Sequence, residues 1–240
     1  MINKILVVAA VESETEYINE NLKNKKSDDS NCLDIKKGKI GSKETEVLVT
    51  GPGILNSVYS LTRYLENNAH PDIIIQTGCA GGFTQGNISK GDIGIASEEI
   101  YIHLGTENPE NRFIPSPLPF SLSGKSNIKN SFKTNENFTN SALKIINLKT
   151  DLKAKIYPFI TVSEITSTKE KADNLFSCYN AGMENMEGAG TAYVSFLYDI
   201  PFIEIRSASN QAGTRDKNQW DFKLSFVNSG KAVSEFIKNI

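Results

Sequence analysis

The sequence has few of the residues from which metal centres are built. Its 240 residues contain three cysteines and two histidines. Cys32, Cys79 and Cys178 are an odd number with no C-x-x-C spacing, and His70 and His103 lie far apart in the chain. A zinc site needs several such ligands close together. We therefore expect a protein without a structural metal.

The sequence also lacks a strong charge of either sign and any long apolar run. It carries 26 Lys and Arg against 28 Asp and Glu, which gives a net charge of −2. This balance offers no electrostatic reason to bind nucleic acid or an anionic membrane. No apolar run reaches the roughly 18 residues that span a bilayer. The first residues are not typical of a signal peptide, because their apolar run leads into acids. We expect a soluble cytoplasmic globular protein.

Short apolar runs alternate along the chain with stretches of helical spacing. The expected strands are residues 4–11, 33–40, 46–50, 73–75, 91–102, 155–163 and 201–209. The expected helices are residues 12–24, 57–66, 168–177 and 186–198, and one that starts at about 224. Strands that alternate with helices predict a three-layer α/β/α fold. Residues 105–140 are rich in Pro, Ser, Asn and Lys, and we expect them to form a loop-rich excursion from a single domain of residues 1–240.

Two glycine-rich runs follow predicted strands. Residues 51–53 (GPG) do not continue as G-x-G-x-x-G because Asn56 stands at the last position, so this type of dinucleotide site is not expected. The P-loop pattern is absent as well. Residues 78–82 (GCAGG) are small enough to let a ligand approach the backbone amides. A tight turn between crowded elements explains this second run equally well.

Four charged residues and one cysteine could carry chemistry, and the first of them, Glu12, lies at the carboxyl end of a predicted strand, where α/β folds place ligand sites. Glu12 could orient or deprotonate a water, although the helix dipole also favours an acid at a helix start. Glu187 could accept hydrogen bonds from two adjacent hydroxyls, with the same alternative. Glu204 and Arg206 share one face of a strand, which indicates either an ion pair or a functional pair. Cys79 is either a nucleophile or a small buried thiol.

Short blocks of sequence appear in a defined order along the chain. They are AAVE (9–12), QTGCAGGF (76–83), GDI (91–93), ASE (96–98), TVS (161–163), NMEG (185–188), EIRSASN (204–210) and GTRD (213–216). Their order and spacing resemble the purine nucleoside phosphorylase and nucleosidase superfamily over most of the chain, least over residues 105–150. The last two blocks resemble the futalosine hydrolases within it. The resemblance implies a central mixed twisted sheet and neither a metal nor an organic cofactor.

The resemblance also implies cleavage of the N-glycosidic bond of a purine nucleoside through an oxocarbenium-like transition state. Glu12 would activate the attacking water, and Arg206 and Cys79 would help to hold it. Met186 and Glu187 would bind the ribose. The base would contact Ala80, Gly81, Thr166, Ser167 and Asn210, and the 5′ substituent would contact Trp220 and, from a neighbouring subunit, Phe113 within the excursion.

Asn210 stands where the adenine-cleaving relatives carry an acid. An amide cannot deliver a proton at neutral pH, but its NH₂ group can donate hydrogen bonds to N7 and O6 of a 6-oxopurine. The resemblance therefore favours hypoxanthine as the leaving base. The negative charge of Glu12 would repel phosphate and favour water. Cys79 replaces a serine common in relatives, and Asn185 replaces a second glutamate, so Asn185 receives no role.

We therefore expect futalosine to be hydrolysed to hypoxanthine and dehypoxanthine futalosine, a step of alternative menaquinone biosynthesis. The alternatives are a methylthioadenosine/S-adenosylhomocysteine nucleosidase, a purine nucleoside phosphorylase and a non-catalytic nucleoside-binding sensor. The resemblance implies a homodimer or higher homo-oligomer that binds a small purine nucleoside, with no nucleic-acid or membrane partner. Arg112, Lys125, Arg215 or a backbone amide could bind the carboxylate of the 5′ arm.

Overall fold

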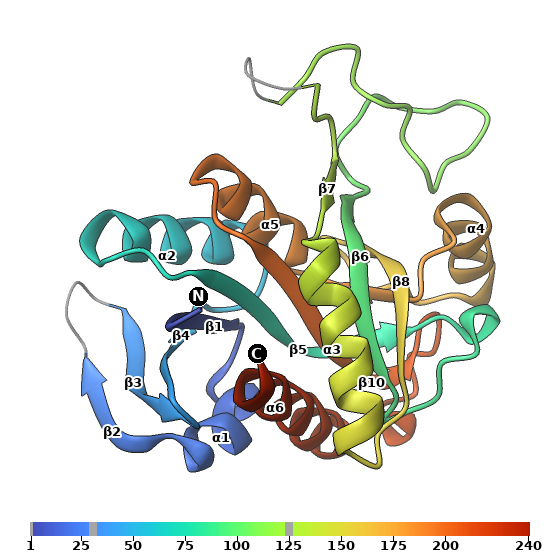
Figure 1. The fold of residues 1–240 in the computed structure, drawn as a ribbon. Coiled ribbons are helices and arrows are strands. Elements are labelled where there is room, and N and C mark those ends of the chain that lie inside the picture. Colours follow the sequence, from blue (N-terminus) through green and yellow to red (C-terminus); the bar gives the residue numbers. More distant parts are fainter. Residues whose placement is uncertain (1, 29–32, 123–126) are drawn as a thin grey trace.

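The apolar runs form the strands of one mixed sheet (Figure 1). The structure is a computed structural model that describes residues 2–28, 33–122 and 127–240. Its strands are β1 (Lys4–Ala9), β2 (Lys23–Asp28), β3 (Asp34–Ile40), β4 (Lys43–Val49), β5 (Ile73–Gly82), β6 (Ile93–Tyr101), β7 (Ser131–Lys133), β8 (Ala154–Thr161), β9 (Met183–Asn185) and β10 (Phe202–Gln211). Within these ranges the ten-stranded sheet has the order β10-β6-β8-β9-β5-β1-β4-β3-β2, and β7 pairs with β6. The predicted α/β fold with a central mixed sheet is confirmed.

The sheet closes on itself at one end. Strand β10 pairs parallel to β5 and antiparallel to β6. Strand β6 continues through β8 and β9 back to β5. These strands form a ring, whereas β1, β4, β3 and β2 extend from β5 as an open sheet. The carboxyl ends of the parallel neighbours β1, β5 and β10 therefore meet at one edge, where α/β folds bind ligands.

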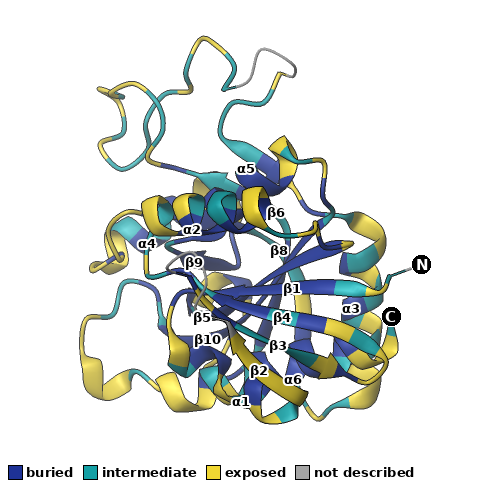
Figure 2. Ribbon diagram, turned by 90° about the vertical axis from the view of Figure 1, so that its left-hand side faces the viewer, coloured by how far each residue is buried: buried dark blue, intermediate teal, exposed yellow. Residues whose placement is uncertain are grey.

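Helices cover both faces of the sheet. They are α1 (Glu12–Asn21), α2 (Ile54–Asn67), α3 (Glu136–Lys149), α4 (Lys169–Tyr179), α5 (Gly188–Leu197) and α6 (Phe222–Asn239). Along β1, Ile5 and Val7 pack with residues of α1, α3 and α6, whereas Leu6 and Val8 pack with residues of α2 and α5. A strand covered on both faces needs a continuous apolar run, as this one has. Figure 2 shows the buried strands between helices whose outer faces are exposed.

The excursion after β6 is more regular than its composition predicts. Residues 104–122 extend away from the sheet (Figure 1), and an isolated bridge joins Thr106 to Ser116. The chain returns as β7 and enters α3, where the side chain of the N-cap Asn135 accepts a hydrogen bond from the amide of Phe138. The expected loop therefore ends near residue 130 rather than 140, because the residues that follow pair as β7 with β6, which is distant in the sequence. No helix in the described ranges is long and apolar enough to cross a membrane.

Three boundaries near the edge of the sheet differ from the sequence prediction. Residues 78–82 form no turn, because β9 and β10 flank them and keep them in β5. Helix α5 starts at Gly188, so Met186 and Glu187 precede it, and they follow the unpredicted strand β9. Strand β10 runs on to Gln211, so Asn210 lies within it, after a bulge that begins at Ala208.

Candidate active site

A cavity of about 230 Å³ lies where the carboxyl ends of β1, β5 and β10 meet. Its lining brings together residues from strands β5, β9 and β10 and from helices α1 and α6. The sequence predictions that lie in it are Cys79, Ala80, Gly81, Met186, Glu187, Arg206, Asn210 and Trp220. Other lining residues that sequence reasoning missed include Glu14, Glu184, Ile165, Phe222 and Phe226.

The carboxylate that enters the cavity near β1 belongs to Glu14 and not to Glu12. The side chain of Glu12 is 66% exposed and forms an ion pair with Lys36 at 2.5 Å, which lowers its pKa. Glu14 is buried and lines the cavity. Residues two apart on a helix point roughly 200° apart, so only one of these acids can face the sheet. This corrects the prediction for Glu12, whose role requires a carboxylate inside the cavity.

Backbone amides hold Glu14 in place. Its Oε2 accepts hydrogen bonds from the amides of Ala10 (3.0 Å) and Val11 (3.3 Å), and its Oε1 accepts one from Cys79 (2.9 Å). A Cβ on Gly78 would lie 2.4 Å from Oε1, and Gly78 has a φ of +139°. Only glycine suits such a position. Burial raises the pKa of Glu14, and the guanidinium of Arg206 opposes that rise.

The thiol of Cys79 is suited to packing rather than to attack. Burial, and next the negative charge of Glu14, raise its pKa well above the ordinary value. The nucleophile is the thiolate, so a raised pKa makes this a poor one. Cys79 instead contributes its backbone, because its amide donates to Glu14 and its carbonyl accepts from Arg206.

Arg206 connects the acids around the cavity. Its Nε donates to Glu204 Oε1 at 2.6 Å, and its Nη2 donates to Glu187 Oε2 at 3.2 Å. Its Nη1 donates to the carbonyl of Cys79 at 2.9 Å, and Nη2 also reaches Asn185 Oδ1 at 3.4 Å. Because Arg206 is only 1% exposed, these charge-assisted bonds fix the guanidinium in one orientation.

A further buried acid, Glu99, supports this network. It accepts hydrogen bonds from the hydroxyl of Thr161 at 2.6 Å and from the amide group of Asn185. Burial, and next the charge of Glu204, raise the pKa of Glu99 well above its ordinary value. The carbonyl of Asn185 accepts from the backbone amides of Glu187 and the following residue. Asn185, to which the sequence analysis gave no role, therefore orients Glu187.

Glu187 is anchored through both of its oxygens. Oε1 accepts a hydrogen bond from the amide of Gly53 at 2.9 Å, and Oε2 pairs with Arg206. Each carboxylate oxygen has a second lone pair, so the group can still accept hydrogen bonds from a ligand. Met186 lies beside it in the lining. The arrangement suits a ligand that presents hydroxyl groups.

Around Gly81 the lining presents backbone, the amide side chain of Asn210 and the carboxyl group of Glu184. Ala80 and Gly81 line it without large side chains. Asn210 lies on β10 opposite Gly81, and it is 5% exposed. Its Oδ1 accepts from the hydroxyl of Ser209 at 2.8 Å, and its Nδ2 donates to the carbonyl of Gln211 at 3.1 Å. One N–H of this amide therefore remains to donate to a ligand.

Two residues predicted to contact a base lie outside the lining. Thr166 is buried, and its amide donates to Glu184 Oε1 at 3.1 Å. Ser167 is exposed.

Burial raises the pKa of Glu184 to about 7. Glu184 belongs to the three-residue strand β9, which is too short to show any periodic signal in the sequence. Glu14 did have a signal, because it lies four residues before the buried Ile18, on the same helix face.

Three aromatic side chains form one wall of the cavity. The rings of Trp220 and Phe222 pack edge to face with centroids 5.5 Å apart, and Phe222 stacks on Phe226 at 5.9 Å. The indole Nε1 of Trp220 donates to the carbonyl of Thr214 at 3.1 Å. This wall is apolar, so it suits a planar or apolar substituent.

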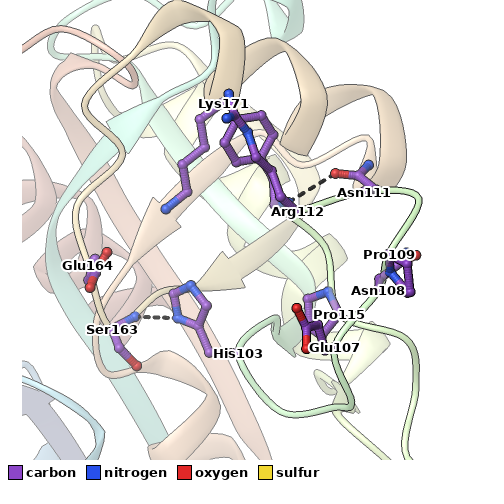
Figure 3. Close-up of a pocket in the computed structure, with 11 residues that line it drawn as sticks. His103, Glu107, Asn108, Pro109, Asn111, Arg112, Pro115, Ser163, Glu164 and Lys171 are labelled. Carbon is purple, nitrogen blue, oxygen red and sulfur yellow. Dashed lines mark hydrogen bonds between the residues drawn. The ribbon is translucent and has the colours of Figure 1, made fainter.

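Phe113 lies in a second cavity of about 540 Å³, between the excursion and α4 (Figure 3). His103 accepts a hydrogen bond there from the amide of Ser163 at 2.8 Å. Arg112 lies over the ring of Phe113 and pairs with Glu170 at 3.0 Å. The structure therefore does not bring Phe113 and Trp220 of one chain into one cavity.

The cationic candidates for a 5′ carboxylate do not line the first cavity. Arg112 belongs to the second cavity, Arg215 is exposed, and Lys125 lies outside the described residues. Cys32 lies outside them as well. The part of the chain that the structure describes contains no group of three or more His, Cys, Asp or Glu placed to hold a metal ion.

The fold and the cavity define an α/β protein with a small-molecule site lined by buried carboxylates at the carboxyl ends of its strands. A family model described as "Phosphorylase superfamily" matches residues 4–240, and the chain belongs to that superfamily. It is 27% identical over 190 residues to a futalosine hydrolase of Thermus thermophilus, and the aligned region covers 79% of this chain and 80% of that protein. It is 25% identical over 227 residues to a 5′-methylthioadenosine/S-adenosylhomocysteine nucleosidase of Bacillus thuringiensis, and the aligned region covers 91% of this chain and 90% of that protein.

The fold is also that of solved nucleosidase structures. The structure of a 5′-methylthioadenosine/S-adenosylhomocysteine nucleosidase from Neisseria meningitidis, in complex with methylthio-immucillin-A, matches with a TM-score of 0.86. The match covers 100% of both chains at 19% sequence identity. At this identity the likeness concerns the fold alone.

Proposed function

We propose that the protein is a nucleosidase that hydrolyses the N-glycosidic bond of futalosine and releases hypoxanthine. One observation carries the proposal: Glu14, Glu187 and Arg206 line a single cavity, and the amide side chain of Asn210 belongs to the same lining. The similarity to a futalosine hydrolase and to nucleosidases supports the same reaction class. The ribose would lie against Glu187 and Met186, and the base against Ala80, Gly81 and Asn210.

Glu14 is the proposed general base. Three backbone amides aim its carboxylate, which leaves one lone-pair site, on Oε1, to hold a water molecule. The water oxygen attacks C1′ of the ribose, the C1′–N9 bond breaks, and its electron pair leaves with the base. The proton of the water passes to Glu14. A positioned general base of this kind contributes about 10²–10⁴-fold to a rate.

Glu187 and Asn210 would act on the two fragments that separate. The carboxylate of Glu187 accepts hydrogen bonds from the ribose hydroxyls and lies where positive charge grows on the ring. The remaining N–H of Asn210 donates to N7 or O6 of a 6-oxopurine, where negative charge grows. An amide can stabilise this charge but cannot protonate it, so the departing base takes its proton from solvent.

The surroundings of Arg206 favour water over phosphate as the nucleophile. The guanidinium has five N–H donors, and Glu204, Glu187, Asn185 and the carbonyl of Cys79 already accept from it. Little donor capacity is left to hold a phosphate. The carboxylates of Glu14 and Glu187 in the same cavity would repel a dianion as well.

The aromatic wall of Trp220, Phe222 and Phe226 is the proposed site of the 5′ arm. Phe113 of the same chain lies in the other cavity, so a Phe113 that closed this wall would come from a second copy. We therefore include a homodimer in the proposal. Light scattering after size-exclusion chromatography gives the mass directly, and a monomeric protein that is fully active would remove Phe113 from the site.

Base release from three nucleosides tests the proposal. The protein is incubated with futalosine, inosine and methylthioadenosine, each with and without phosphate, and the bases are separated by chromatography. Hypoxanthine from futalosine at a rate that phosphate does not change is the expected result. Release that requires phosphate would indicate a phosphorylase, adenine from methylthioadenosine alone would indicate the other nucleosidase class, and no release at all would favour a nucleoside-binding sensor.

A further inference from the structure

Glu184 is a buried acid inside the cavity that the proposed reaction does not use. It lies on β9, is 3% exposed and belongs to the lining. Its Oε1 accepts a hydrogen bond from the backbone amide of Thr166, but its Oε2 is buried with no hydrogen-bond partner among the described residues. Within the described ranges the hydroxyl of Thr166 has no hydrogen bond within the usual distance limits either, although it lies near enough to the Glu184 carboxyl group to lower its pKa. A buried polar atom that lacks a partner is costly, so a site that keeps one calls for an explanation.

The register of the sheet places Glu184 and Asn210 on either side of the same glycine. Gly81 of β5 pairs with Glu184 on β9 and with Asn210 on β10. Residues in register share a face, and neighbouring strands lie about 4.8 Å apart, so the two Cα atoms are roughly 10 Å apart across Gly81. A Cβ on Gly81 would lie 3.2 Å from Glu184 Oε1. Glycine at this position therefore lets the side chain of Glu184 lie close against β5, on the face that also carries Asn210.

We propose that Glu184 determines which purine is bound, because its Oε2 accepts a hydrogen bond from the N1–H of a 6-oxopurine whose O6 or N7 accepts from Asn210. The inference rests on the proposed function and names the base that its site selects. A 6-oxopurine presents a donor at N1 and acceptors at O6 and N7. A 6-aminopurine presents an acceptor at N1 and a donor at the 6-amino group. The carboxylate form of Glu184 matches the first pattern, whereas its protonated form can donate to N1 of the second.

The protonation state of Glu184 then governs the choice of base. Burial raises its pKa to about 7, and the hydroxyl and backbone amide of Thr166, followed by the charge of Lys171 on α4, act against that rise. The other titratable groups of the same cavity are Glu14, Cys79, Glu187 and Arg206. A ligand N–H stabilises the carboxylate and lowers the pKa in the complex. Affinity for a 6-oxopurine should therefore rise as pH increases through about 7, and affinity for a 6-aminopurine should fall.

Binding of the free bases tests this inference without any need for turnover. Trp220 is the only tryptophan of the sequence and lines the cavity, so its fluorescence reports occupancy. Hypoxanthine and adenine are titrated at about pH 6 and about pH 8, on either side of the Glu184 pKa of about 7. The proteins compared are the wild type, Glu184→Gln and the control Glu164→Gln. Glu164 is an exposed acid in the second cavity, so its replacement removes the same charge outside the site.

In the wild type and in Glu164→Gln, hypoxanthine should bind more tightly at the higher pH and adenine at the lower. In Glu184→Gln both dependences should vanish, and hypoxanthine at the higher pH should bind on the order of tenfold to a hundredfold more weakly, the range for a hydrogen bond to a charged group. Unchanged hypoxanthine affinity in a folded Glu184→Gln would overturn the inference while leaving futalosine cleavage intact. A wild type that binds neither base would overturn the proposed function and this inference together.

Discussion

Replacing Glu14 by Gln tests the proposed mechanism at its most specific point. The substitution keeps the size of the side chain but removes the charge and the basicity. The side-chain oxygen of Gln can accept a hydrogen bond from the backbone N–H of Cys79, or from those of Ala10 and Val11. Its NH₂ group then faces the remaining backbone N–H donors. Leaving such buried donors unpaired costs about 1–3 kcal/mol, part of which is offset because the buried negative charge is lost.

The expected loss of activity is far larger than the expected loss of stability. Removing a general base should lower the rate about 10²–10⁴-fold, which corresponds to roughly 3–5 kcal/mol of barrier. A stability loss of about 1 kcal/mol lowers the melting temperature of a chain of this size by only about 2–4 °C. Initial rates of hypoxanthine release at saturating futalosine, together with melting curves, separate the two effects.

Glu12→Gln is the matched control, because it changes the same residue type two positions earlier in the same helix. Its carboxylate is exposed and pairs with Lys36 at the surface, so neither rate nor stability should change measurably. The reasoning would be refuted by a folded Glu14→Gln that turns over at close to the wild-type rate. It would be refuted equally by a Glu12→Gln that loses activity while Glu14→Gln keeps it.

Three further substitutions probe the surroundings of the site. Asn210→Asp restores a group that can carry a proton, so the ratio of rates on methylthioadenosine and futalosine should shift at least about tenfold toward the 6-aminopurine; an unchanged ratio would remove Asn210 from base recognition. Gly78→Ala adds a Cβ 2.4 Å from Glu14 Oε1 at a φ of +139° and should lower the free energy of unfolding by about 2–4 kcal/mol. Gly53→Ala, at a φ of +88° with nothing within 4 Å of the added Cβ, should show the smaller backbone effect alone, and equal losses in chemical denaturation would contradict the steric argument. Glu99 binds its proton more tightly in the folded chain than in the unfolded one, so wild-type stability should fall as pH rises above the ordinary pKa of about 4.5. Over the same pH interval the melting temperature of Glu99→Gln should rise relative to that of the wild type. Parallel curves of melting temperature against pH would show that Glu99 is ionised.

The sequence predicted most of the parts of the fold whose residues carry a local period, but it missed helix α3, although the buried Ala142 and Ile146 are four residues apart. Strand β1 was readable because a strand buried on both faces is continuously apolar. Helix α2 was readable from its amphipathic spacing, with Leu61 and Leu65 on its buried side. Strands β7 and β9 were not readable, because three residues show no period and their partners β6, β8 and β5 are distant in the chain. The closure of the sheet through β10 and β5 depends on the same kind of distant pairing.

The candidate site divides along a similar line. Gly81, Glu187, Arg206 and Asn210 were predicted, and the structure brings them together in one cavity. The choice between the acids at the start of α1 failed because both lie at the end of β1 in sequence, and only the helix rotation separates them.

The charge balance around Arg206 gives a reason why so many acids converge on one cavity. The carboxyl groups of Glu14, Glu187 and Glu204 surround a single guanidinium, and burial and the charge of Glu204 raise the pKa of Glu99 behind them. Acidic groups therefore outnumber basic ones in a buried region, where electrostatic interactions are strong. Such an excess would destabilise a bound anion and stabilise a cation that forms between Glu14 and Glu187. A ribose losing its base at C1′ becomes such a cation, so the network that holds Arg206 would also favour the proposed transition state over the ground state.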